Sequence, residues 1–306
     1  FMIPLADQGP LPFKGKQAIA VLVCFALLAL GCAIHFARGY SLSDQPGHGW
    51  GCDDAFISYR YAQHSAQGLG LVFNQGERVE GYSSLFYVLL LRPVFFIMDG
   101  MNVYYASVVL NGICVCVAFL LFVDEVTRRI GTAKATGVAF LFALCPPMWV
   151  WVASGLETSL VLLLQIVVWI AVGRVERDGS RMIRWLLFAS LAASILARPE
   201  GVLLPAAVIL YLLARGRHGE AAWCLIVVVL TALPLLAWRY VYYGYPLPNT
   251  FYAKVSGPLL ERLSRAAGQL WNIALREGLL VNLLMMAIVL LLILIRSGSR
   301  LRYAAS

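Results

Sequence analysis

Two adjacent aspartates, Asp53 and Asp54, carry the side chains in this sequence that most need a chemical explanation. They follow the first long apolar run, residues 18–36, in a chain where polar groups are scarce. Ionisable residues at a bilayer are functional-site candidates by default. A carboxylate there can act as a general base on a substrate that is itself partly lipid. The alternative is that both acids only cap a helix, because Asp is favoured at a helix start.

Composition fixes the broad class of protein. The 306 residues are 61% hydrophobic and 13% charged, with a mean hydropathy of +0.78. Soluble domains are roughly half apolar and a quarter charged, so the chain is expected to be a multi-pass membrane protein. The net charge of +8 fits membrane orientation better than nucleic-acid binding. The seven cysteines lie mostly in apolar runs without zinc-type spacing, which predicts no metal centre built from them.

Eight runs are apolar enough to predict an all-α bundle of about eight spanning helices. They are residues 18–36, 103–123, 135–151, 158–173, 185–197, 201–214, 221–241 and 279–295. The first run is too long for a signal-peptide core and is expected to be a retained span. We therefore expect an N-terminal tail over residues 1–16 and one transmembrane domain over residues 17–306.

The predicted orientation of the chain in the membrane depends on whether the run Leu85–Met98 spans the bilayer or lies on its surface. It is short and interrupted by Arg92-Pro93, and proline removes a helix donor. If it lies on the membrane surface, all the basic loops share one face, which the positive-inside rule makes cytoplasmic. Those loops hold Lys14, Lys16, Arg128, Arg129, Lys134, Arg174, Arg177, Arg181, Arg184, Arg215, Arg217, Arg296, Arg300 and Arg302. Residues 38–102 then form one long first outer loop, and the amphipathic stretch 258–276 is expected at the same outer interface.

The outer face then collects the loops that could do chemistry. These are Asp53–Arg60, Glu77–Glu80, Ser154–Thr158, Ala197–Gly201 and Pro246–Lys254. An outward site has no access to cytoplasmic nucleotide sugars or ATP, so its activated substrate must already be in the membrane. The spans are nearly free of charge and the ionisable groups gather on one side, which argues against a transporter, where such groups are expected at mid-depth.

Several of these side chains have both a functional and a structural interpretation. Arg198 could grip a phosphate through its guanidinium, or it could pair with Glu200 to close a hairpin. Lys254 could neutralise a phosphate or extend to the interface. Glu157 could accept sugar hydroxyls or be only a helix-start acid.

The motif strings also resemble a known family. Residues 53–62, 70–74 and 76–83, followed by 154–158, 198–201 and 247–254, resemble GT-C-type membrane glycosyltransferases that use polyprenyl-phosphate sugars. The order and spacing match over about residues 17–255. The branch that the sequence most resembles is the terminal arabinofuranosyltransferases of bacterial envelopes, including relatives that decorate pilins. Mannosyl- and aminoarabinose transferases are more distant.

This resemblance implies a GT-C-like fold in the bacterial inner membrane and a periplasmic site. It implies inverting transfer of a sugar, arabinofuranose in this branch, from a polyprenyl phosphate to a cell-envelope glycan or a pilin. Carried onto this sequence, the catalytic candidates are Asp53 and Asp54; the donor-phosphate candidates are Arg60, Arg198 and Lys254; the sugar or acceptor candidates are Glu80, Glu157, Glu200, Asn249 and Tyr252. No metal site is implied, although two adjacent aspartates could hold Mg²⁺ or Mn²⁺ weakly.

Three alternatives stay open at this point. The same fold could transfer mannose or aminoarabinose, the chain could transport a lipid or small solute, or it could be a membrane scaffold whose acids are helix caps. Many relatives continue into further spans and an outer carboxy-terminal domain, whereas this sequence stops at Ser306. We therefore expect acceptor recognition to differ from theirs.

Overall fold

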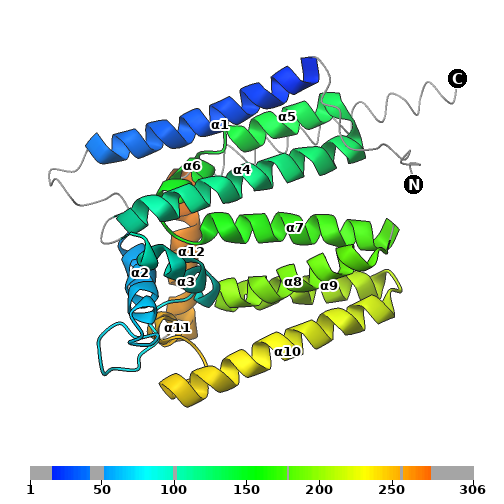
Figure 1. Ribbon diagram of the computed structural model, residues 1–306. Helices are drawn as coiled ribbons and strands as arrows, with labels where there is room; N and C mark the ends of the chain where they lie inside the picture. Colours follow the sequence, from blue (N-terminus) through cyan, green and yellow to red (C-terminus); the bar gives the residue numbers. More distant parts are fainter. Residues whose placement is uncertain (1–15, 42–51, 99–101, 178, 256–257, 277–306) are drawn as a thin grey trace, which may run out of the picture.

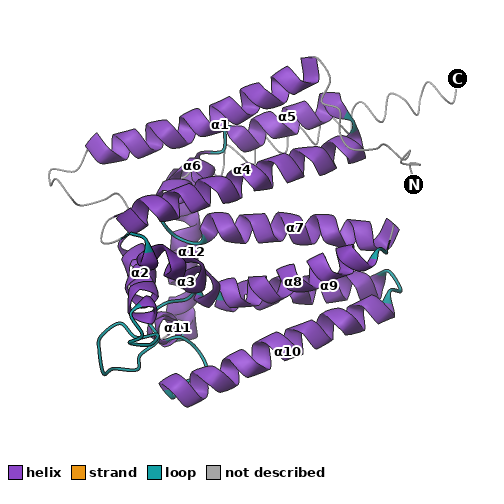
Figure 2. Cartoon of the chain, viewed as in Figure 1, coloured by secondary structure: helices purple, strands orange, loops and turns teal. Residues whose placement is uncertain are grey.

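The computed structural model describes residues 16–41, 52–98, 102–177, 179–255 and 258–276. These residues form helices and connecting loops without a strand (Figure 2). The helices are α1 (Lys16–Ser41), α2 (Asp53–Ala66), α3 (Leu85–Leu91), η1 (Arg92–Phe96), α4 (Asn102–Ile130), α5 (Thr132–Ala143), α6 (Pro146–Ala153), α7 (Thr158–Arg177), α8 (Arg181–Ala197), η2 (Pro199–Val202), α9 (Leu203–Ala214), α10 (His218–Tyr243), α11 (Asn249–Val255) and α12 (Leu259–Arg276). The all-α prediction is confirmed for this part of the chain.

The long helices lie side by side as a bundle, and the short ones gather at one of its ends (Figure 1). Helix α1 packs against α5 and α6, α4 joins that group to α7, and α8 and α10 continue the row. In Figure 1, α2, α3 and α12 run across the direction of the bundle at its left end. That the first loop and residues 258–276 lie along a membrane surface stays a prediction.

Three described helices are long and apolar enough to cross a membrane: α4, α7 and α10. The pair α5 and α6 would make a fourth, but it bends by 51° between the two helices. The apolar stretches in α1, in α3 with η1, and in η2 with α9 are shorter. The chain is therefore an all-α membrane protein with three or four such spans among the described residues, and the count of eight stays a prediction. The run 279–295 lies outside the described residues.

The predicted span over residues 135–151 is broken, because the helix stops at Ala143 and a new one starts at Pro146. Proline lacks the backbone donor that a continuing helix needs, whereas it is well accommodated in a first turn. The dipeptide Pro146-Pro147 therefore starts α6 rather than extending α5. The same logic explains the expected break at Arg92-Pro93, where α3 gives way to the 3₁₀ turn η1.

The direction of each helix sorts the loops between the two ends of the bundle. In Figure 1 the chain follows α4 away from the end where α2 lies, returns through α5 and α6, and repeats this with α7–α8 and α9–α10. The turns at residues 153–158, 197–203 and 243–249 therefore share an end with α2, which we call the site end. The basic turns after α4, α7 and α9 share the opposite end, which we call the arginine end.

Candidate functional site

Helix α2 presents the two aspartates at its start. Cys52 occupies the N-cap position, and Asp53 and Asp54 form the exposed first turn. The expected side-chain cap is absent at this helix start, since the N-cap makes no side-chain hydrogen bond. Two acids in a first turn still interact favourably with the helix dipole. Their carboxylates are thus held at a helix start and stay open to a ligand.

The turn Ser154–Glu157 anchors this helix start, because one backbone N–H and two tyrosine hydroxyls donate to its backbone carbonyls. The Cys52 N–H donates to the Ser154 carbonyl at 2.9 Å. The hydroxyls of Tyr59 and Tyr87 both donate to the Gly155 carbonyl, at 3.2 and 2.9 Å. Gly155 has a φ of +77°, and a Cβ there would collide with the Tyr59 hydroxyl, so only glycine fits. The aspartates are therefore fixed beside the turn that precedes α7.

The same turn ends on Glu157, whose side chain pairs with Arg198. Glu157 is only 2% exposed, and its Oε1 accepts a short contact from Arg198 Nη1. Arg198 Nε also donates to Glu200 Oε1 at 2.8 Å. Burial lowers the pKa of the Arg198 guanidinium, but the charges and hydrogen bonds of Glu157 and Glu200 together outweigh burial, so the pKa is raised. One permanent cation is thus shared by two carboxylates at the turn between α8 and α9.

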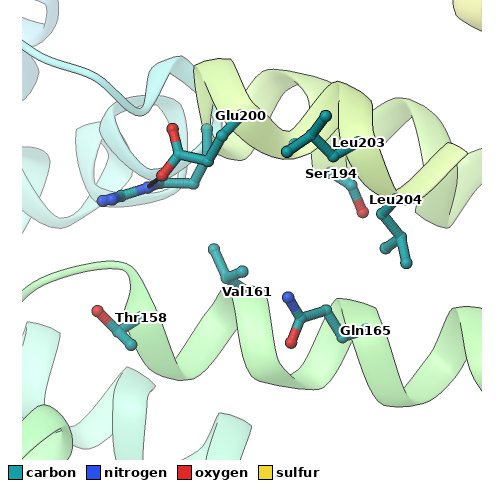
Figure 3. Close-up of a pocket in the computed structure, with 9 residues that line it drawn as sticks. Thr158, Val161, Gln165, Ser194, Glu200, Leu203 and Leu204 are labelled. Carbon is teal, nitrogen blue, oxygen red and sulfur yellow. Dashed lines mark hydrogen bonds and ion pairs between the residues drawn. The ribbon is translucent and has the colours of Figure 1, made fainter. Parts of the chain in front are cut away.

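A cavity of about 480 Å³ opens beside this arginine, between α7, α8 and α9. Its charged end is formed by Arg198 and Glu200, and Thr158, Val161 and Gln165 line one wall along α7 (Figure 3). At 1.5 Å per residue, Thr158 and Gln165 are about 10 Å apart along the helix. Ser194, Leu203 and Leu204 form the facing side (Figure 3). The cavity therefore leads from an ionic mouth into apolar helix surfaces.

A second ionic group lies at the same end of the bundle. Glu80 is 3% exposed and accepts a hydrogen bond from Arg239 Nε at 2.9 Å. The Glu80 carbonyl accepts from the Asn249 N–H, also at 2.9 Å, which ties the first loop to the start of α11. Burial raises the pKa of Glu80, while Arg239 and the nearby Tyr82 hydroxyl oppose that shift. Glu80 and Asn249 are thus brought together.

The remaining predicted residues lie apart from these two groups. Arg60 donates to the Phe73 carbonyl at 3.4 Å and to Gln63, so it steadies the loop after α2. Tyr252 is 40% exposed and lies against Tyr245. Lys254 belongs to α11, but its side chain is outside the described residues.

Sequence reasoning missed two side chains at these groups, Arg239 and Gln165. Arg239 is 4% exposed and lies inside the run predicted as the span 221–241. A charge within an apolar run is itself a functional signal, and it was available in the sequence. Gln165 is a lone amide in the run 158–173, exposed within the cavity wall.

The expectation that ionisable groups gather on one side is wrong. At the arginine end, Glu125 is fully buried and pairs with Arg129 and Arg177, at 2.8 and 3.1 Å. Asp124 pairs with Arg128 at 3.0 Å. Asp124 and Glu125 follow directly after the apolar run 103–123. The charge pattern assigns that segment to a basic loop through its arginines and lysine, and the two acids were not considered as partners for them.

In the described part of the chain, no cluster of three or more His, Cys, Asp or Glu side chains is placed to hold a metal ion. A divalent cation at Asp53 and Asp54 would therefore need further oxygen ligands from a substrate, such as a phosphate.

Comparison with known proteins gives one match. The chain is similar to the terminal β-(1→2)-arabinofuranosyltransferase of Mycobacterium tuberculosis (strain ATCC 25618 / H37Rv), with 28% identity over 239 residues. The match covers 73% of this chain and 36% of that enzyme's length, so the chain spans much less than the whole relative. No family model matches the sequence, and no solved structure matches it.

Proposed function

We propose that this protein is a GT-C-type glycosyltransferase that moves a sugar from a polyprenyl phosphate to an acceptor hydroxyl outside the cytoplasm. The similarity to an arabinofuranosyltransferase supports glycosyl transfer and makes arabinofuranose the sugar to test first. A cell-envelope glycan or a pilin would be the acceptor. In this proposal the chain has about eight spans in a bacterial inner membrane, and the site end faces the periplasm because the arginine end faces the cytoplasm.

One observation carries the proposal: the Cys52–Ser154 hydrogen bond joins the aspartate helix to the turn that ends on Glu157, and Glu157 pairs with Arg198 of the neighbouring turn. Acids for proton transfer and a cation for phosphate thereby meet at one end of the bundle. The cavity beside Arg198 has an ionic mouth and apolar walls, which suits a phosphate on a hydrocarbon chain. A scaffold protein would not require this convergence.

The reaction then follows from the residues. Asp53 or Asp54 removes the proton of the acceptor hydroxyl. The hydroxyl oxygen bonds to the anomeric carbon on the face opposite the phosphate, and the bond from that carbon to the phosphate oxygen breaks. The electron pair leaves with polyprenyl phosphate, and Arg198 stabilises the charge that develops there. The sugar inverts, and the proton stays on the aspartate until solvent removes it.

Separate substitutions Asp53→Asn and Asp54→Asn test the proposal. Loss of a general base lowers a rate by about 10² to 10⁴, so one variant should lose transfer from a radiolabelled polyprenyl-phosphate arabinofuranose by that factor. The other variant would show a smaller loss. Glu77→Gln, an exposed acid in the same outer loop, is the matched control. Full transfer by both asparagine variants would exclude the aspartates as the base.

A set of donor lipids that carry different sugars distinguishes arabinofuranose from the alternative donor sugars. Polyprenyl phosphates carrying arabinofuranose, mannose or aminoarabinose are offered to the same preparation, and the sugar transferred fastest is assigned. Movement of intact labelled lipid across a vesicle membrane, with no glycoside formed from any donor, would instead support a transporter.

A further inference from the structure

The cavity beside Arg198 has a charge balance that does not suit an incoming phosphate. Among the described residues that line it, Arg198 is the one cation, and two carboxylates already bind this arginine. Glu157, Glu200 and Arg198 together carry one net negative charge. A phosphate that enters the cavity is therefore repelled until one of the two carboxylates moves away from the guanidinium.

The two carboxylates bind different nitrogens of the guanidinium. Glu157 accepts from Nη1, whereas Glu200 accepts from Nε at 2.8 Å. The Nε–H and one Nη2–H of an arginine point in the same direction, and this edge can bind two oxygens of a phosphate at once. Glu200 therefore occupies part of the edge that a phosphate would need, and Glu157 holds the guanidinium from another side.

Burial decides which carboxylate gives way. The Glu157 side chain is 2% exposed, so removing its arginine would leave a buried charge unpaired, which is strongly unfavourable. The Glu200 side chain is 57% exposed, so water can hydrate its carboxylate when the bond to Arg198 breaks. Its departure leaves a neutral Glu157–Arg198 pair with the Nε–Nη2 edge available to a ligand in the cavity that Arg198 lines (Figure 3).

We infer that Glu200 is an exchangeable counter-ion of Arg198, which the donor phosphate displaces and which returns to expel the product phosphate. The inference rests on the proposed function for the identity of the ligand as a lipid phosphate. The donor is a phosphodiester with one negative charge, whereas the polyprenyl phosphate that leaves is a monoester with about 1.5 to 2 negative charges at pH 7. Glu200 repels the product more strongly than the donor, so it shifts the selectivity of the cavity toward the donor.

This role predicts the opposite effect on ligand binding from the sugar contact that the family resemblance implies for Glu200. A carboxylate that accepts from a sugar hydroxyl strengthens donor binding and does not affect a phosphate that carries no sugar. A counter-ion weakens the binding of every phosphate that competes with it for Arg198. Phosphates without a sugar therefore distinguish the two roles.

The test is isothermal titration calorimetry of the purified full chain with two probes, citronellyl phosphate and its methyl diester, at pH 8. Glu200→Gln removes one negative charge near Arg198. At about 6 Å in water, this should tighten binding of the singly charged diester about threefold and of the doubly charged monoester about tenfold. Glu200→Asp keeps the charge and should bind both probes as the wild type does. So should Glu77→Gln, which changes an exposed acid of the outer loop. Thermal unfolding identifies any variant that has lost its fold.

Folded Glu200→Gln that binds both probes no more tightly than the wild type would overturn the inference. Equal tightening in Glu200→Asp, or no binding of either probe to any variant, would do so as well. Because the probes carry no sugar, the effect of Glu200 can be measured even if no sugar is transferred. Tenfold tightening without transfer from any donor would sustain the counter-ion role and remove the proposed function, whereas normal transfer with unchanged probe binding would do the reverse.

Discussion

Both ends of the helix bundle bury a glutamate against arginine, but the ratio of acids to arginines is reversed. At the site end, one arginine, Arg198, is shared by Glu157 and Glu200. At the arginine end, the fully buried Glu125 lies 2.8 to 3.6 Å from three guanidinium groups. These belong to Arg129, Arg174 and Arg177.

The difference shows how the same ion pair can serve packing or chemistry. The Glu125 cluster joins α4 to α7, and Arg129 also lies over the Trp169 ring at 4.4 Å. At the site end, Glu157 is buried and fixed, whereas the Glu200 side chain is 57% exposed and can move away. A phosphate entering the adjacent cavity can therefore replace Glu200 on Arg198. A cation with an exchangeable partner beside a cavity suits binding, and a cation in a closed network suits stability.

The largest expected effect is on transfer activity, when an arginine is replaced by lysine at each end in separate variants. Arg198→Lys keeps the charge that Glu157 needs but loses the planar fork that binds two oxygens at once. We expect transfer from the lipid-linked sugar to fall about a hundredfold. Arg129→Lys should leave transfer per folded molecule unchanged, because Arg129 contacts only packing partners. Equal losses in the two variants would remove the distinction between the ends.

The next largest effect is on stability. Here the substitution at the arginine end should cost more free energy of unfolding than the one at the site end. Breaking a buried ion pair costs about 3–5 kcal/mol, and somewhat less here because the three arginine side chains are about a third exposed. Glu125→Gln should therefore lower the free energy of unfolding by about 2–3 kcal/mol. Glu157→Gln should lower it by only about 1 kcal/mol, since Arg198 keeps Glu200.

Denaturant unfolding in detergent, read by tryptophan fluorescence, gives both values. Transfer assays on the folded fractions complete the comparison, with Glu125→Gln active and Glu157→Gln impaired. A Glu157→Gln variant that loses more stability than Glu125→Gln would contradict the assignment of the arginine end to packing.

The last comparison uses two glycines. A Cβ at Gly201 would collide with the Ser194 carbonyl, so α8 and η2 would have to separate, at a cost of about 1–3 kcal/mol. A Cβ at Gly173 would meet only Arg129 Nη2, the far end of a flexible side chain, and should cost less than about 1 kcal/mol. Gly201→Ala should also reduce transfer, because Gly201 lines the cavity with Arg198. Unfolding midpoints and transfer rates of the two alanine variants provide the measurement, and a larger loss from Gly173→Ala would refute it.

Much of the architecture could be read from the sequence because its causes are local. An apolar run long enough to span a bilayer predicts a helix, and each turn between runs reverses the chain. Basic loops therefore alternate with motif loops, and this places Ser154–Thr158 and Ala197–Gly201 at the same end as Asp53. The break before α6 also had a local signal in Pro146-Pro147, which the apolarity of residues 135–151 hid.

The partners of the charged residues could not be read in this way. Glu80 and Arg239 are 159 positions apart, and nothing in the sequence around either residue specifies the other. Arg198 does pair with Glu200, two residues away, as one of its two interpretations from the sequence predicts, but its buried partner is Glu157, 41 positions earlier. Such pairs depend on how α2, α8 and α10 pack together.

The sequence by itself determined that this is a helical membrane protein with its chemically suggestive loops at one end, because hydrophobicity and charge act on each segment separately. Only the tertiary structure decided that a cavity lies there beside Arg198 and that Glu80 pairs with Arg239. The physical reason is that a cavity and a buried ion pair are properties of several packed helices at once. Their energies depend on distances between segments that are far apart along the chain.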